Sequence, residues 1–195
     1  AKSVVEGFLT RQEDWLKQKC GANAFERPQL PVIPLGIHAE EWQQPNNDIK
    51  KAKIEARNKL NIPQNGLVVL IAGRLDVQTK FHPSQTFRIL NELTIEFPEL
   101  RVLIYGESPT DMQFDLWKKG VKLIAPNLTI DWIPGRIKEL SNTVRWASDL
   151  FLSIVDNPQE TFGITPLEAM AASLPCIVSD WDGYRDTVIQ PEESN

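Results

Sequence analysis

The chain has 195 residues, of which 42% are hydrophobic and 24% are charged, close to the values of an ordinary soluble globular protein. This length suits one main domain, with or without an additional segment, and argues against several independent domains. The formal net charge is -5, with basic residues dispersed among acidic ones, which argues against nucleic acid as the main partner. An anionic small ligand would therefore need a local basic site.

The sequence has no feature of a membrane-spanning or secreted chain. No apolar run approaches the roughly 18 residues that a membrane helix needs, and no basic region followed by an apolar region opens the sequence. We therefore expect a cytoplasmic protein without a membrane span. The two cysteines, Cys20 and Cys176, have no metal-ligand neighbours at zinc-finger spacing, so we expect reduced thiols and no bound metal.

The first 62 residues predict two helices joined by a connector. Ser3 and Glu6 stand in capping-box order, and the apolar residues that follow recur at helical spacing, which predicts a helix that ends at Gly21. Residues 27–45 contain four prolines and a short apolar run, which predict an extended linker with at most one brief strand. Residues 47–62 predict a charged helix that stops before Pro63. We therefore assign residues 1–62 to a helix, a linker between domains and a charged helix, and residues 63–195 to the main domain.

From residue 67 onward, continuous Val, Ile and Leu runs alternate with helical segments. Such runs are typical of strands buried on both faces, and intervening helices favour right-handed crossovers in a parallel sheet. The expected fold class is α/β, with a doubly wound parallel Rossmann-like sheet and ligands beyond the carboxyl ends of the strands. The expected strands are 67–73, 101–107, one drawn from 121–125 and 128–133, 149–155 and 175–180. The expected helices are 82–97, 111–120, 135–147 and 165–173.

The first strand ends in "AGRLDVQTK", which places Gly73, Arg74, Asp76 and Lys80 on the ligand side. Arg74 can bind a phosphate through two parallel hydrogen bonds and Lys80 adds a mobile charge, so together they could neutralise a diphosphate without a metal. The alternative is two solvated surface cations. One glycine stands where a dinucleotide fingerprint needs three, which disfavours a Rossmann dehydrogenase. Gly106, after the second strand, permits either a close backbone approach or a turn.

The segment "QETFGITPLEAM", residues 159–170, is the densest local signal. Thr165 and Glu168 fit a capping box with Pro166 in the first helical turn, a purely structural explanation of the pattern. Gly163 stands just before the predicted helix, where the missing side chain lets a ligand reach the amides of Ile164 and Thr165. The segment therefore predicts a helix cap or an anion site, and Glu168 can belong to both.

Glu160 precedes this helix and has no capping role. An anion repels a carboxylate, so Glu160 suits hydrogen bonds from neutral hydroxyls attached to that anion. Glu168 could accept hydrogen bonds from a second set of hydroxyls. A ligand with hydroxyls at both ends of a diphosphate is a nucleotide sugar.

On these residues the chain resembles the C-terminal half of the retaining glycosyltransferases of family 4, also called glycosyl transferases group 1. The resemblance is carried by "VIPLGI" near residue 35, "AGRL" with Lys80 six positions after Arg74, the two glutamates within "ETFGITPLEAMAASLP", and "VSDWDGYRDTV". It covers most of residues 30–190. It implies the GT-B architecture, in which two Rossmann-like domains face each other across a cleft.

The resemblance implies a role for each site residue. Arg74, Lys80 and Glu160 are the expected catalytic residues; the first two hold the donor diphosphate and the third binds the donor sugar. Phe81 and Ser173 depart from glycines that family members usually have, and Phe81 alters the loop beside the phosphates. Trp132 and Ile133 fall where the family commonly holds the base. The expected donor-binding residues are Gly73, Gly163, Ile164, Thr165 and Glu168, the last of which binds the ribose.

The resemblance further implies retaining transfer of a sugar from a UDP-, GDP- or ADP-sugar, without a metal or other cofactor. The acceptor would be bound by an N-terminal domain outside this sequence, and the full enzyme could contact a membrane peripherally. A glycoside hydrolase also uses two carboxylates. We disfavour this alternative because the cations expected beside Glu160 suit a leaving diphosphate and have no task in hydrolysis. His38 and His82 are expected to be linker and loop residues. An isolated nucleotide-sugar binding module, or a sugar-phosphate binding protein with this fold, stays an alternative.

Overall fold

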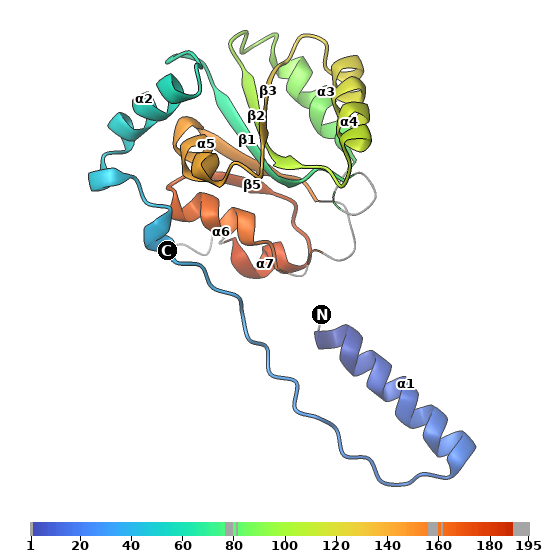
Figure 1. The fold of residues 1–195 in the computed structure, drawn as a ribbon. Coiled ribbons are helices and arrows are strands. Elements are labelled where there is room, and N and C mark those ends of the chain that lie inside the picture. Colours follow the sequence, from blue (N-terminus) through green and yellow to red (C-terminus); the bar gives the residue numbers. More distant parts are fainter. Residues whose placement is uncertain (1, 77–79, 81, 156–159, 161, 189–195) are drawn as a thin grey trace. The chain divides into compact units, whose positions relative to one another are not determined.

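The computed structural model describes residues 2–76, 80, 82–155, 160 and 162–188. The chain forms two compact units, Ala1–Gly36 and Ile37–Asn195 (Figure 1). Within the described residues, no helix is both long enough and apolar enough to cross a membrane.

The first unit consists of helix α1 (Lys2–Cys20) and an extended segment that follows it. Gly21 ends the helix with a φ of 64°, a backbone conformation that glycine adopts at little cost. The extended segment returns to the helix through Arg27, whose Nη2 donates to the Glu13 carboxylate at 2.7 Å. The predicted helix is confirmed, but it begins at Lys2, so Ser3 lies inside it and not at its N-cap. No residue of α1 is buried.

Five parallel strands form the sheet of the second unit. Their order, β3-β2-β1-β4-β5, reverses direction at β1, which places a topological switch point between β1 and β4. In open α/β sheets this point, at the carboxyl ends of the strands, is where ligands bind. The predicted doubly wound α/β fold is confirmed. The strands are β1 (Val68–Arg74), β2 (Arg101–Glu107), β3 (Thr129–Pro134), β4 (Leu150–Ser153) and β5 (Cys176–Val178).

Helices cover both faces of this sheet (Figure 1). Successive side chains of β1 point to opposite faces, so Val69 and Ile71 enter one core cluster and Val68 and Leu70 enter the other. The first cluster lies under α3 (Pro83–Leu93) and α4 (Asp111–Ile124). The second lies under α2 (Ile49–Lys59), α5 (Ser141–Ala147) and α6 (Ile164–Ala171). Both faces of the central strands are therefore buried, as their continuous apolar runs indicated.

Several elements differ from the prediction. Residues 121–124 continue α4, because buried Trp117 and Val121 lie four residues apart and pack together against the sheet. A short 3₁₀ helix (Lys138–Leu140) precedes α5, and a short helix α7 (Gly183–Thr187) follows β5. Among described residues, the linker has no strand and instead contains two 3₁₀ turns, Ala39–Glu41 and Pro45–Asn47.

The charged helix α2 belongs to the second unit. The side chain of Arg57 is buried, its Nε donates to the Ala147 carbonyl at 3.0 Å, and its Nη2 binds Asp149 Oδ2 at 2.7 Å. The boundary that we predicted at residue 62 therefore falls inside this compact unit.

Candidate functional site

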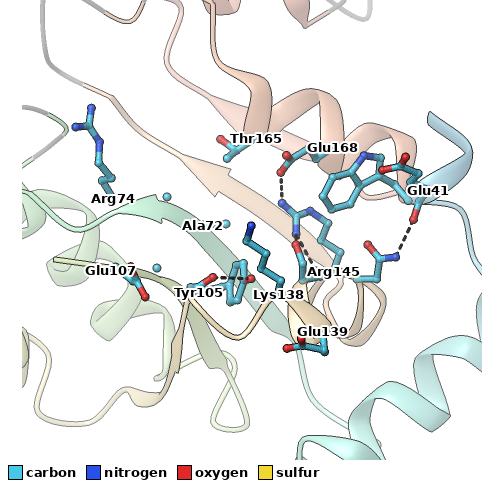
Figure 2. Close-up of a pocket in the computed structure, with 16 residues that line it drawn as sticks. Glu41, Ala72, Arg74, Tyr105, Glu107, Lys138, Glu139, Arg145, Thr165 and Glu168 are labelled. Carbon is cyan, nitrogen blue, oxygen red and sulfur yellow. Dashed lines mark hydrogen bonds and ion pairs between the residues drawn. The ribbon is translucent and has the colours of Figure 1, made fainter. Parts of the chain in front are cut away.

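A cavity of about 700 Å³ opens at the carboxyl ends of β1 and β2 (Figure 2). The strands contribute backbone and short side chains, and the segment 135–145 and helix α6 contribute charged and polar side chains. Its lining includes Trp42, Gly73, Arg74, Gly106, Gly135, Lys138, Arg145, Thr165 and Glu168.

Two glycines shape the floor of the cavity. Gly106 lies inside β2, and a Cβ at this position would stand 2.0 Å from the Gly73 carbonyl oxygen. The glycine therefore permits a close backbone approach, the first of the two interpretations of the sequence. Gly73 has a φ of 145°, and a Cβ there would have nothing within 4 Å. The backbone of Gly73 is thus open toward the cavity.

Arg74 is the last residue of β1 and lies on the rim of the cavity with an exposed side chain. It forms no hydrogen bond or ion pair with another described residue, and Figure 2 shows its guanidinium extending away from the other labelled side chains. Because no described carboxylate neutralises it, this guanidinium can bind an anion that enters the cavity.

Lys80 and Glu160, both predicted as catalytic, lie side by side. Lys80 Nζ is 2.7 Å from Glu160 Oε2, and the side chains are 25% and 10% exposed. The backbone carbonyl of Glu160 also accepts a hydrogen bond from the Gly183 amide at 2.9 Å. Neither residue lines the cavity of Figure 2. Phe81, which departs from the family pattern, lies outside the described residues.

The start of α6 differs from the predicted capping box. Gly163 is the N-cap, with a φ of 75°, no side-chain capping bond forms there, and Thr165 is the second residue of the helix. A Cβ on Gly163 would stand 2.0 Å from the Tyr184 ring, so packing as well as backbone conformation requires glycine. The capping-box interpretation is wrong because Gly163 already turns the chain and the Glu168 carboxylate has another partner. Ile164 is 40% exposed, and Thr165 lines the cavity.

That partner is Arg145, a site residue that the sequence analysis missed. Its Nη2 pairs with Glu168 Oε2, and the two side chains are 2% and 17% exposed. Burial raises the pKa of the Glu168 carboxyl, and the facing guanidinium opposes this rise. Arg145 lies in the predicted helix 135–147, and the one acidic residue at helical spacing from it, Asp149, stands beyond that helix in the next predicted strand. Glu168 is 23 residues away, so only the packing of α5 against α6 reveals the pair.

The two predicted base-binding residues lie away from this cavity. The Trp132 ring packs edge-on against Phe114 and Trp117, with centroid distances of 5.6 and 6.3 Å. Ile133 packs against the second core cluster. Gly135 and Lys138, a few residues further along, line the cavity instead.

Neither His38 nor His82 lines the cavity of Figure 2, where a general base would have to lie. His82 is the N-cap of α3, and its ring nitrogen accepts a hydrogen bond from the Ser84 amide at 3.3 Å. His38 immediately precedes the 3₁₀ turn Ala39–Glu41 and is exposed. Within the part of the chain that the structure describes, no three His, Cys, Asp or Glu residues gather as a potential metal site.

The parallel sheet with helices on both faces defines a Rossmann-like unit of the α/β class. Residues 52–194 match the family described as Glycosyl transferases group 1, and the chain belongs to that family. D-inositol 3-phosphate glycosyltransferase of Streptomyces avermitilis is 26% identical over 168 residues, which are 81% of this chain and 33% of the relative. The Nocardioides sp. protein of the same name is 28% identical over 147 residues, which are 68% and 31% of the two chains. The chain thus spans about a third of these relatives.

Solved glycosyltransferases share the fold. The structure of WaaG, a glycosyltransferase involved in lipopolysaccharide biosynthesis, matches with a TM-score of 0.62 and 22% identity, over 80% of this chain and 40% of WaaG. Anabaena HepE in complex with UDP-glucose matches with a TM-score of 0.57 and 19% identity, over 80% and 40% of the two chains. The C-terminal domain of LpcC from Francisella tularensis matches with a TM-score of 0.55 and 18% identity, over 80% and 76%. These likenesses concern the fold, which is that of GT-B glycosyltransferases.

Proposed function

We propose that this chain is the donor-binding domain of a retaining, metal-independent family 4 glycosyltransferase in the cytoplasm. It takes a sugar from a nucleoside-diphosphate donor and passes it to an acceptor held by an N-terminal domain. Membership of the family supports the reaction class. The complex of the similar-fold Anabaena HepE with UDP-glucose supports the donor class. The match to about a third of each curated relative is consistent with one domain of a larger enzyme.

One observation carries the proposal. The cavity at the carboxyl ends of β1 and β2 presents an exposed guanidinium, Arg74, and a carboxylate, Glu168, on separate elements. A cation suits the diphosphate and a carboxylate suits hydroxyls, so a ligand that carries both groups is complementary to the cavity. The backbone of Gly73, open toward the cavity, allows the diphosphate to approach β1 closely.

The arrangement suits breakage of the bond between the anomeric carbon and the diphosphate oxygen. The bonding electron pair leaves with the diphosphate, so negative charge grows there while the sugar becomes oxocarbenium-like. Arg74 and the amides at the start of α6 can stabilise that growing charge more strongly than the charge of the ground state, which lowers the barrier. We assign no protein nucleophile to the retaining step.

Lys80 and Glu160 serve the sugar side of the same reaction in this proposal. Glu160 Oε2 pairs with Lys80. Its Oε1 has no hydrogen-bond partner among the described residues and can accept hydrogen bonds from sugar hydroxyls. Lys80 pairs with this carboxylate and supplies a second positive charge for the leaving diphosphate. Trp132 and Ile133 remain our sequence prediction for the residues that contact the nucleotide base of the donor. Lys138, which lines the cavity, is a further candidate for that contact.

A thermal-shift panel tests the donor site. UDP, GDP, ADP and their glucose conjugates are compared with the corresponding nucleosides, which lack the diphosphate. A ligand at roughly 100 times its Kd should raise the free energy of unfolding by about 2.7 kcal/mol. If neither the diphosphates nor their conjugates shift the melting temperature, the donor-site proposal is wrong. Sugar transfer by the chain joined to an N-terminal half distinguishes the enzyme from a binding module.

A further inference from the structure

Arg145 is a nearly fully buried charge at the edge of the cavity. Its guanidinium pairs with Glu168 Oε2 through Nη2. Its Nη1 donates to the carbonyl oxygen and to the hydroxyl of Ser141, at 2.7 and 2.8 Å. Its Nε is buried and has no hydrogen-bond partner among the described residues. Burying a guanidinium costs free energy even when it is paired, so a fully apolar residue would serve packing alone at lower cost.

Trp42 holds the same guanidinium from another side. Arg145 Cζ lies 4.4 Å from the centroid of the Trp42 ring, a distance typical of a cation–π contact. The backbone of Trp42 is itself fixed, because its carbonyl accepts a hydrogen bond from Trp146 Nε1 at 3.0 Å. The following turn is tied to the end of α6, where Gln44 Nε2 donates to the Ala172 carbonyl at 2.5 Å. Arg145 is therefore held between Ser141, Trp42 and Glu168.

This arrangement fixes one oxygen of Glu168 and leaves the other available. Oε2 accepts from Arg145, whereas Oε1 makes no hydrogen bond with another described residue. Glu168 lines the cavity, and Figure 2 shows its carboxylate directly above the Arg145 guanidinium. A carboxylate oxygen has two lone pairs, so Oε1 can accept from two neighbouring hydroxyls of one ligand.

We propose that Arg145 and Trp42 are positioning residues that orient Glu168 so that Oε1 accepts hydrogen bonds from the 2′- and 3′-hydroxyls of the donor ribose. The inference rests on the proposed function, because the ribose belongs to the donor nucleotide. Trp42 precedes α2 in sequence and nevertheless sets the geometry of a carboxylate on α6. Ribose recognition thus depends on how residues 39–47 lie against α5 and α6.

Paired nucleotides with and without ribose hydroxyls test this inference. The dissociation constants of UDP, GDP and ADP, and of their 2′,3′-dideoxy counterparts, are measured by calorimetry on the whole chain. The wild type is expected to prefer the ribose form by about tenfold or more, because hydrogen bonds to a charged acceptor are strong. R145Q and W42L should reduce that preference to below about threefold and leave the dideoxy affinity nearly unchanged.

Three further variants separate positioning from general packing. W42F keeps an aromatic face over the guanidinium and should retain most of the preference for ribose. E168Q should lose the preference as R145Q does, and R145Q combined with E168Q should lose no more than either variant alone. A purely structural role of Trp42 would weaken ribose and dideoxy nucleotides alike and leave their ratio unchanged. If R145Q does not fold, the comparison of W42L with W42F decides, because the Trp42 side chain is only half-buried.

The measurements distinguish failure of the proposed function from failure of the positioning role of Arg145 and Trp42. A wild type that binds none of the nucleotides overturns the proposed function and this inference with it. A wild type that binds them without a preference for ribose, or variants that keep the full preference, overturns the inference alone.

Discussion

Lys80 and Glu160 form an ion pair across 80 residues of sequence, with Nζ 2.7 Å from Oε2. Glu160 is 8% exposed, so its carboxylate has little water to replace the lysine. The pair joins the chain after β1 to the chain after β4, the two strands that flank the switch point. It therefore contributes to the stability of the same region in which we propose the chemistry.

K80M should destabilise the protein. Removing the ammonium leaves a buried carboxylate without its partner, which costs about 1–3 kcal/mol of unfolding free energy. Urea unfolding measures this loss. The control is K51M, since Lys51 and Glu55 form a 4.0 Å pair whose side chains are 68% and 64% exposed. That variant should change stability by less than about 0.5 kcal/mol. Equal losses in the two variants would contradict the assigned role of the buried pair.

Arg74→Ala should weaken donor binding and catalysis without weakening the fold. The side chain is exposed and has no described partner, so the unfolding free energy should change by less than about 0.5 kcal/mol. Loss of one preorganised charge donor costs roughly 2.7–4 kcal/mol of transition-state stabilisation, which is about a hundredfold or more in transfer rate. Arg88→Ala, an exposed arginine on α3, is the matched control. An unchanged transfer rate in the Arg74 variant of the full enzyme would refute its assignment.

Gly163→Ala should destabilise the start of α6. The residue has a φ of 75°, and the new Cβ would lie 2.0 Å from the Tyr184 ring. Left-handed backbone costs roughly 1–2 kcal/mol for a non-glycine residue, and the clash adds to that cost. Gly120→Ala in α4 is the control, because its Cβ would meet nothing within 4 Å. It should stabilise the protein by about 0.5–1 kcal/mol. Thermal unfolding should therefore shift in opposite directions, and equal shifts would contradict the packing argument.

The two cysteines should react with iodoacetamide at different rates. Burial raises the pKa of the Cys176 thiol to about 11, which holds the thiol neutral at pH 8, with roughly 0.1% as reactive thiolate. Cys20 is exposed. Mass spectrometry of the folded protein at pH 8 should show Cys20 modified first and Cys176 at least about tenfold more slowly. Since the thiolate fraction grows toward a pKa of about 11, the Cys176 rate should rise steadily with pH while the protein stays folded. Equal rates at pH 8 would contradict the buried environment.

Much of the fold could be predicted because its signals are local. The continuous apolar runs at 67–73 and 101–107 each identify a strand, since a strand buried on both faces has no polar side. The residues 121–125 could not be assigned in the same way. A short apolar segment fits a strand or a buried helix. Val121 lies on the buried face of α4 and packs in the core cluster beside the sheet, which decided for the helix.

The site was only partly predictable for a different reason. The sequence by itself determined the alternating α/β order. It marked Arg74, Lys80 and Glu160 because charges after buried strands stand out locally, and it marked Glu168 because this residue stands in the first turn of a predicted helix. Only the tertiary structure decided which charges meet. It paired Lys80 with Glu160 and Glu168 with Arg145, and it made Gly163 the N-cap of α6. The physical reason is that an ion pair depends on distances of a few ångströms between separate elements, and sheet order and helix packing set those distances.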